Sequence, residues 1–197
     1  SMENHGEHYR ITTPDDISFN FDFSDITDLQ FRPYMLEVAY EYLTLAIHAR
    51  IGPINEALCA LSLEILFKSF NSKVVKNEGH LNERYEFDQT KVKIAQGHCL
   101  VSLFEAIPQN IRRHLLERTS DLTLLKKFSN AFTTSRYYYE KSHSGSSTDD
   151  LQNLALYAIF KATLMYREKG CLDPFIQLDR PITHYKEVVA ARWSIPT

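Results

Sequence analysis

Residues 135–143 read Ser-Arg-Tyr-Tyr-Tyr-Glu-Lys-Ser-His and contain two side chains suited to phosphate chemistry. Arg136 offers a planar fork of donors that can hold a phosphate, and His143 can exchange a proton near neutral pH. The two residues are seven positions apart, which is two turns of an α-helix, so a helix that runs this far places both on one face. The segment therefore predicts a site at a helix end, just before the Ser/Gly-rich stretch 144–147.

The same segment also has a purely structural interpretation. Arg136 and Glu140 are one helical turn apart and can form a routine ion pair, which leaves His143 as a solvated residue at the helix end. The three consecutive tyrosines 137–139 cannot all face a core, because neighbouring helix residues are about 100° apart. At least one tyrosine must reach a pocket, an interface or solvent, where it can stack on a base or seal a dimer.

Two further places could contribute polar groups to a site. Glu64 and Lys68 are spaced i, i+4 on a helix that is apolar around most of its circumference, where a partly buried charge needs its partner. His98 stands at the start of another expected helix, either as a functional group or as a capping or packing residue. The eight histidines form no HExxH or similar pair and the three cysteines no CxxC pair, so we expect no metal and no cofactor.

Apolar residues at three-to-four spacing predict the helices that position these side chains, among them one over about 34–50 and one that begins at Gly52 and Pro53. A longer helix follows Asp149 and Asp150 and ends at Gly170. These helices indicate an all-α helical bundle over 33–170, with an irregular N-terminal arm at 1–32 and an irregular, proline-bearing C-terminal tail at 171–197 that a short helix around 185–193 closes. A polar insertion at about 71–97 separates the helices and holds a short hairpin between 85–87 and 92–94. Asp121 is expected to cap a helix that continues into residues 135–143.

Composition restricts the classes of partner. The chain has 197 residues and a formal net charge of −3, without the basic excess typical of proteins that bind duplex DNA. No apolar run is long enough to predict a membrane span, and the N-terminus lacks a signal pattern. Widely spaced cysteines favour reduced thiols. We therefore expect a cytoplasmic protein without membrane or duplex DNA partners.

Three segments resemble the HEPN superfamily of helical nucleotide-binding domains. Residues 57–68 (ALCALSLEILFK) are similar to the family's sLExLLK helix. Residues 97–104 (GHCLVSLF) are similar to a GHDLxxLF segment of one bacterial branch, with Cys99 where that branch commonly has Asp. Residues 132–140 (FTTSRYYYE) are similar to that branch's FxxxRYxYE, and the three segments occur in the same order. The likeness covers roughly 34–169 and implies a HEPN-like bundle.

The resemblance also implies a function. Many members are metal-independent ribonucleases with an Arg-x4–6-His motif, which Arg136 and His143 match at the longest spacing. By that analogy Arg136 stabilises the transition state and His143 helps the 2′-hydroxyl attack, leaving a cyclic phosphate end. Tyr137, Tyr139 and Glu140 would support them. The implied partners are RNA or a nucleotide and a second copy of the chain, in a stress or defence setting. Other members are non-catalytic nucleotide- or partner-binding modules, and this alternative stays open.

Overall fold

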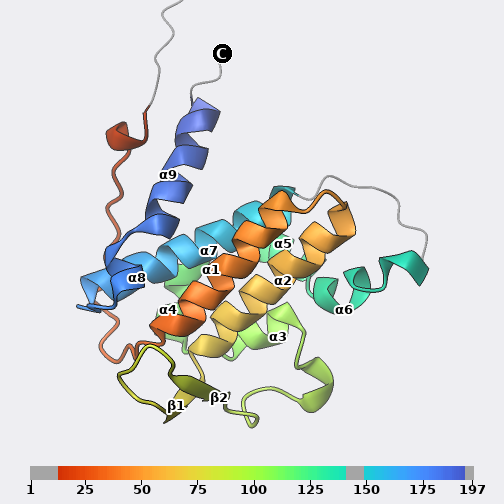
Figure 1. The fold of residues 1–197 in the computed structure, drawn as a ribbon, viewed down its shortest axis with the longest axis horizontal. Helices are drawn as coiled ribbons and strands as arrows, with labels where there is room; N and C mark the ends of the chain where they lie inside the picture. Colours follow the sequence, from red (N-terminus) through yellow and green to blue (C-terminus); the bar gives the residue numbers. More distant parts are fainter. Residues whose placement is uncertain (1–12, 141–148, 194–197) are drawn as a thin grey trace, which may run out of the picture.

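The computed structural model describes residues 13–140 and 149–193, and these are mostly helical (Figure 1). The all-α class is therefore confirmed. A small two-stranded sheet interrupts the helices at the expected polar insertion. No helix among the described residues is long and apolar enough to cross a bilayer.

Two helices joined by a short turn form one layer of the bundle, α1 (Pro33–His48) and α2 (Gly52–Ser69). Each carries a proline in its first turn, where the missing N–H costs nothing. They pack closely along their length, and the Ser62 hydroxyl donates a hydrogen bond of 2.6 Å to the Ala39 carbonyl across the interface. Figure 1 shows the two helices side by side in front of α7. Their bounds agree with the helices expected from the sequence.

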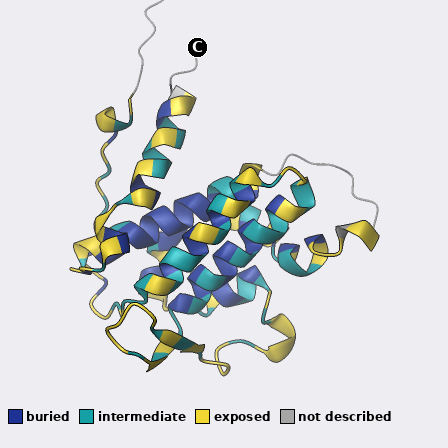
Figure 2. Ribbon diagram, in the orientation of Figure 1, coloured by how far each residue is buried: buried dark blue, intermediate teal, exposed yellow. Residues whose placement is uncertain are grey.

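The longest helix, α7 (Asp149–Glu168), provides the centre of the core. Most of its residues are buried, and Figure 2 shows it nearly covered by its neighbours, whereas exposed residues gather on the hairpin and the segment that follows it. Gly170 has φ +90°, the left-handed conformation that ends helices and that glycine adopts without strain. The helix and its glycine stop were both predicted correctly.

Four short helices connect these layers: α3 (Leu100–Glu105), α4 (Gln109–Leu115), α5 (Thr119–Lys127) and α6 (Ala131–Ser135), with a 3₁₀ turn at Tyr138–Glu140. The helix expected to run unbroken from Asp121 into residues 135–143 is therefore wrong. Asp121 lies within the first turn of α5, buried against Arg118. The chain turns at Ser129, whose carbonyl accepts from Leu100 N–H at 2.9 Å, so that residue serves the start of α3.

The hairpin pairs β1 (Ser72–Lys76) with β2 (Arg84–Phe87) in antiparallel register, with Ser72 opposite Phe87. A hairpin was expected here, but with 92–94 as the second strand, which is wrong. Asp88 explains the difference, because its carboxylate accepts hydrogen bonds from the Thr90 N–H (3.0 Å) and hydroxyl (2.6 Å). This local turn ends β2 and directs residues 92–94 away from it.

After a 3₁₀ turn at Pro14–Asp16, residues 17–32 of the N-terminal arm cross the bundle as an extended segment, as expected. Phe19 and Phe21 are partly buried and Phe23 is 1% exposed. The arm covers Lys161 of α7, whose ammonium lies 3.5 Å from the centroid of the Phe21 ring and 3.5 Å from the Glu117 carboxylate. Burial is the largest influence on this lysine and lowers its pKa.

The C-terminal segment is more helical than the tail expected at 171–197, for which only a short helix around 185–193 was predicted. It contains α8 (Pro174–Gln177) and α9 (Arg180–Trp193). Pro174 and Pro181 suggested an irregular chain, but both occupy the first turn of a helix, where proline is tolerated. Figure 1 shows α9 projecting from the bundle beside the start of the arm.

Candidate functional site

Glu64 is the polar centre of the candidate site. It lies on the apolar helix α2 with a side chain only 7% exposed, so its charge requires partners. Its Oε1 accepts a hydrogen bond of 2.6 Å from His98 Nδ1, and its Oε2 lies 3.3 Å from Lys68 Nζ. The predicted pair of Glu64 with Lys68 is therefore present, and it is joined by a histidine 34 residues away in sequence.

His98 is held at a defined orientation and remains accessible. Its side chain is 47% exposed, and its ring packs against Phe132 with centroids 5.1 Å apart. Because the Glu64 carboxylate is an acceptor, Nδ1 carries the proton, and the neutral ring then has its lone pair on Nε2. A carboxylate that fixes the tautomer in this way leaves Nε2 able to accept a proton from a ligand.

Arg136 reaches the Phe132 ring from the end of α6. Its guanidinium carbon lies 5.2 Å from the centroid of the Phe132 ring and 4.8 Å from that of Tyr137. The preceding residue, Ser135, is buried and donates a hydrogen bond to the Glu56 carboxylate of α2, which anchors the end of α6. The exposed guanidinium can therefore be held in position by aromatic packing.

Phe132 joins the two halves of the site, with His98 and Arg136 both against its ring. It was not among the residues expected to function. The available signal was its spacing, because an aromatic residue four positions before an arginine lies one helical turn away. Of the eight residues predicted for the site, Glu64, Lys68 and His98 are in direct contact, and Arg136 is linked to His98 through the Phe132 ring.

The remaining predicted residues follow α6. No ion pair joins Arg136 to Glu140 in the described part of the chain, because α6 ends at Ser135 and the helical spacing is lost. Tyr137 and Tyr139 are 40% and 70% exposed with ring centroids 6.5 Å apart, which agrees with the expectation that a tyrosine reaches solvent. His143 lies outside the described residues.

Cys99, next to His98, has a polar environment that the sequence did not suggest. Its Sγ lies 3.1 Å from the Ser129 hydroxyl and 3.3 Å from that of Ser102. Partial burial favours the neutral thiol, but hydrogen bonds from both hydroxyls and from the Ser102 and Val101 N–H groups outweigh it, so the pKa of Cys99 is lowered. Buried Cys59 behaves oppositely, since burial raises its pKa to about 12.

The site therefore offers a cation for a phosphate, an oriented imidazole and exposed aromatic rings. Within residues 13–140 and 149–193, no cluster of three or more His, Cys, Asp or Glu side chains could hold a metal ion. The chemistry available from these residues is anion binding and proton transfer. No protein-family model, no curated protein and no solved structure matches this chain.

Proposed function

We propose that this chain is a HEPN-like protein that binds single-stranded RNA at the Glu64–His98–Arg136 site and cleaves it without a metal ion. The observation that carries the proposal is the convergence on one aromatic ring, since Phe132 contacts both an arginine and a histidine that a buried carboxylate orients. Phosphate transfer to a neighbouring hydroxyl needs charge stabilisation and a proton acceptor, which these side chains supply.

In the proposed reaction, Arg136 binds the non-bridging oxygens of the scissile phosphate. Nε2 of neutral His98 accepts the proton of the 2′-hydroxyl as that oxygen attacks phosphorus. The bond from phosphorus to the 5′-oxygen breaks, and the leaving oxygen takes a proton from water. The products are a 2′,3′-cyclic phosphate and a 5′-hydroxyl end. Glu64 stabilises the imidazolium formed on His98.

Incubation of single-stranded RNA with the protein in EDTA tests this proposal. We expect a cyclic phosphate end, and a rate that falls about 10²-fold in Arg136→Ala, because a positioned charge donor is lost. Arg50→Ala is the matched control, since Arg50 is also exposed and lies at the turn between α1 and α2. His143→Ala determines whether His143 takes part. Absence of product with the wild type would refute the cleavage proposal.

The exposed Tyr137 and Tyr139 rings favour a second candidate, in which the site binds RNA or a nucleotide without cleaving it. Under this alternative, Arg136→Ala weakens binding and no cyclic phosphate appears. The second copy of the chain and the cytoplasmic setting expected from the sequence stay predictions. Sedimentation of the full chain tests the first of them.

A further inference from the structure

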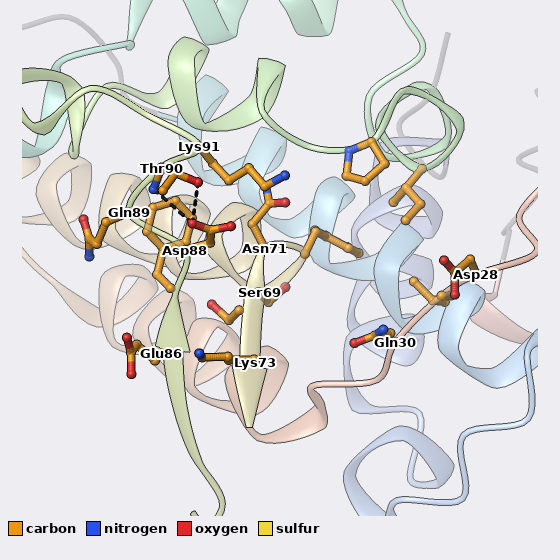
Figure 3. A pocket seen from close by; sticks show the side chains of 16 residues that line it. Asp28, Gln30, Ser69, Asn71, Lys73, Glu86, Asp88, Gln89, Thr90 and Lys91 are labelled. Atoms are coloured by element: carbon orange, nitrogen blue, oxygen red, sulfur yellow. Dashed lines mark hydrogen bonds between the residues drawn. The ribbon is translucent and has the colours of Figure 1, made fainter. Parts of the chain in front are cut away.

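A pocket of about 810 Å³ lies at the end of α2, between the hairpin and the N-terminal arm (Figure 3). Residues 69–73 line it from one side, the turn 86–91 from a second, and Asp28 and Gln30 from across the pocket. Pro108 and Ile111 complete the lining. The volume is within the range of small-molecule sites, about 300–1,000 Å³.

Hydrogen bonds fix the segments around the pocket in advance. Asp88 N–H donates to the Asn71 carbonyl at 2.9 Å, and the Asn71 side chain donates to the Ala106 carbonyl at 3.0 Å. Arg32 donates to the Ser72 carbonyl and to the Gln30 side chain, both at 2.8 Å, and so ties the arm to the hairpin. A ligand would therefore meet walls that are already ordered, which reduces the entropic cost of binding.

The lining combines groups that suit a nucleotide. Gln30 and Gln89 offer amide donors and acceptors, and Phe87 offers an aromatic ring. Lys73 and Lys91 line the pocket, and neither belongs to an ion pair among the described residues. These two ammonium groups can hold phosphates at the rim.

The carboxylates of the pocket restrict which base it would accept. Asp28, Glu86 and Asp88 line it, and ionised carboxylates can only accept hydrogen bonds. Adenine and cytosine each carry an exocyclic amino group that donates, as cytosine N4 does to Asp or Glu in known recognition. Uracil has no amino group, so it offers these carboxylates fewer hydrogen-bond donors.

Lys68 links the pocket to the site around Glu64. Lys68, which pairs with Glu64, also places its ammonium 5.5 Å from the centroid of the Phe87 ring, and Phe87 lines the pocket. Glu64 and Ser69 are five residues apart on α2, which a rise of about 1.5 Å per residue makes about 7.5 Å along the helix.

We propose that the pocket lined by 69–73 and 86–91 binds a base of the same RNA strand whose phosphate is held at Arg136 and His98, and that it prefers adenine and cytosine to uracil. The inference rests on the proposed function, since it concerns the same RNA. The strand then follows α2, from Arg136 over Lys68 to the pocket.

Fluorescence anisotropy with short 2′-O-methyl oligonucleotides of A, C or U tests the inference, because these oligonucleotides cannot be cleaved. The test variant is Gln89→Ala/Lys91→Ala. The matched control is Gln96→Ala/Lys93→Ala, which makes the same changes at exposed positions outside the pocket. We expect the test variant to bind the A and C oligonucleotides about tenfold more weakly than wild type, about 1.4 kcal/mol. The control should stay within about twofold of wild type, where twofold corresponds to less than 0.5 kcal/mol.

The possible outcomes distinguish a failure of the pocket hypothesis from a failure of the proposed function. If the test variant and the control bind RNA equally well while Arg136→Ala binds it more weakly, the pocket does not bind a base, and the proposed function stands. Equal wild-type affinity for all three oligonucleotides overturns the base preference. Failure of wild type to bind any of them overturns the RNA function and the pocket with it. Thermal unfolding of each variant shows whether lost binding comes from lost folding.

Discussion

Replacing Glu64 with glutamine separates the orienting role of this residue from its contribution to stability. Glu64→Gln keeps the shape of the side chain and removes its negative charge. In the wild type that charge accepts the His98 Nδ1–H at 2.6 Å and faces Lys68 Nζ at 3.3 Å. A neutral amide satisfies these donors less well, and its own NH₂ group can face one of them.

The cost in stability follows from the exposure of the partners. The i, i+4 pair with Lys68, whose side chain is 24% exposed, contributes about 0.3–0.5 kcal/mol. A hydrogen bond to a charged group contributes about 1.5–3 kcal/mol, which we reduce to about 1 kcal/mol because the His98 side chain is 47% exposed. The total of about 1–2 kcal/mol lowers Tm by roughly 2–8 °C in a chain of this size.

The effect on cleavage should exceed the effect on binding. The rate at saturating RNA should fall about 10- to 100-fold, part of the 10²–10⁴ that a positioned proton-transfer group contributes. Affinity for uncleavable RNA should change less than about twofold, because the Arg136 guanidinium still holds the phosphate. Glu105→Gln on the exposed side of α3 is the matched control. Wild-type cleavage by Glu64→Gln, together with the expected fall in Tm, would refute the orienting role.

Three further predictions follow from individual side chains. Iodoacetamide should label Cys99 several-fold faster than Cys59 or Cys171 at neutral pH, because hydrogen bonds lower the pKa of Cys99 whereas burial raises the pKa of the other two. Mass spectrometry of the folded protein after labelling measures these rates. Equal labelling of the three cysteines would contradict the prediction. Lys161→Met should raise the free energy of unfolding by about 1 kcal/mol at neutral pH, because it removes a charge whose burial is unfavourable, while Glu117, 37% exposed, keeps its hydrogen bond from Tyr157. Because burial lowers the pKa of Lys161, the unfolded chain binds more protons than the folded protein as pH approaches 10.5. The wild type therefore gains stability as pH rises through this range, and the stability advantage of the variant shrinks. Chemical denaturation of both proteins across this pH range tests the prediction, and a stability difference that does not depend on pH would contradict it. Burial also lowers the pKa of His184 from 6.5, so the stability of the wild type should fall as pH drops below that value. His184→Gln should weaken this pH dependence. If the free energy of unfolding of the variant changes with pH as steeply as that of the wild type, the prediction is wrong.

The parts of the fold that the sequence predicts best are those with a long apolar period. Helices α1, α2 and α7 each present apolar residues at three-to-four spacing, and Gly170 supplies a clear stop. The errors occurred where a local signal had two physical meanings. Pro174 and Pro181 were interpreted as breaks, although proline also suits a first helical turn.

The site was only partly predictable because its contacts are non-local. The spacing of Glu64 and Lys68 indicated their pair, but nothing in the sequence places His98 on the same carboxylate. The helix expected to run from Asp121 through Arg136 is broken after Lys127, where Ser129 bonds to the start of α3, which is a tertiary contact. The periodic spacing of apolar residues cannot indicate such a contact, because the partners are far apart along the chain.

The most direct test of the site is to follow its histidine during RNA binding. NMR of histidine ring nitrogens, with resonances assigned by His98→Gln and His184→Gln, can be recorded while uncleavable single-stranded RNA is added. We predict that Nε2 of His98 shifts as RNA binds and that His184, between α1 and α9, does not. The Arg136→Ala variant should require more RNA for the same shift. Saturable RNA binding with unchanged His98 resonances would contradict a site built from Glu64, His98 and Arg136.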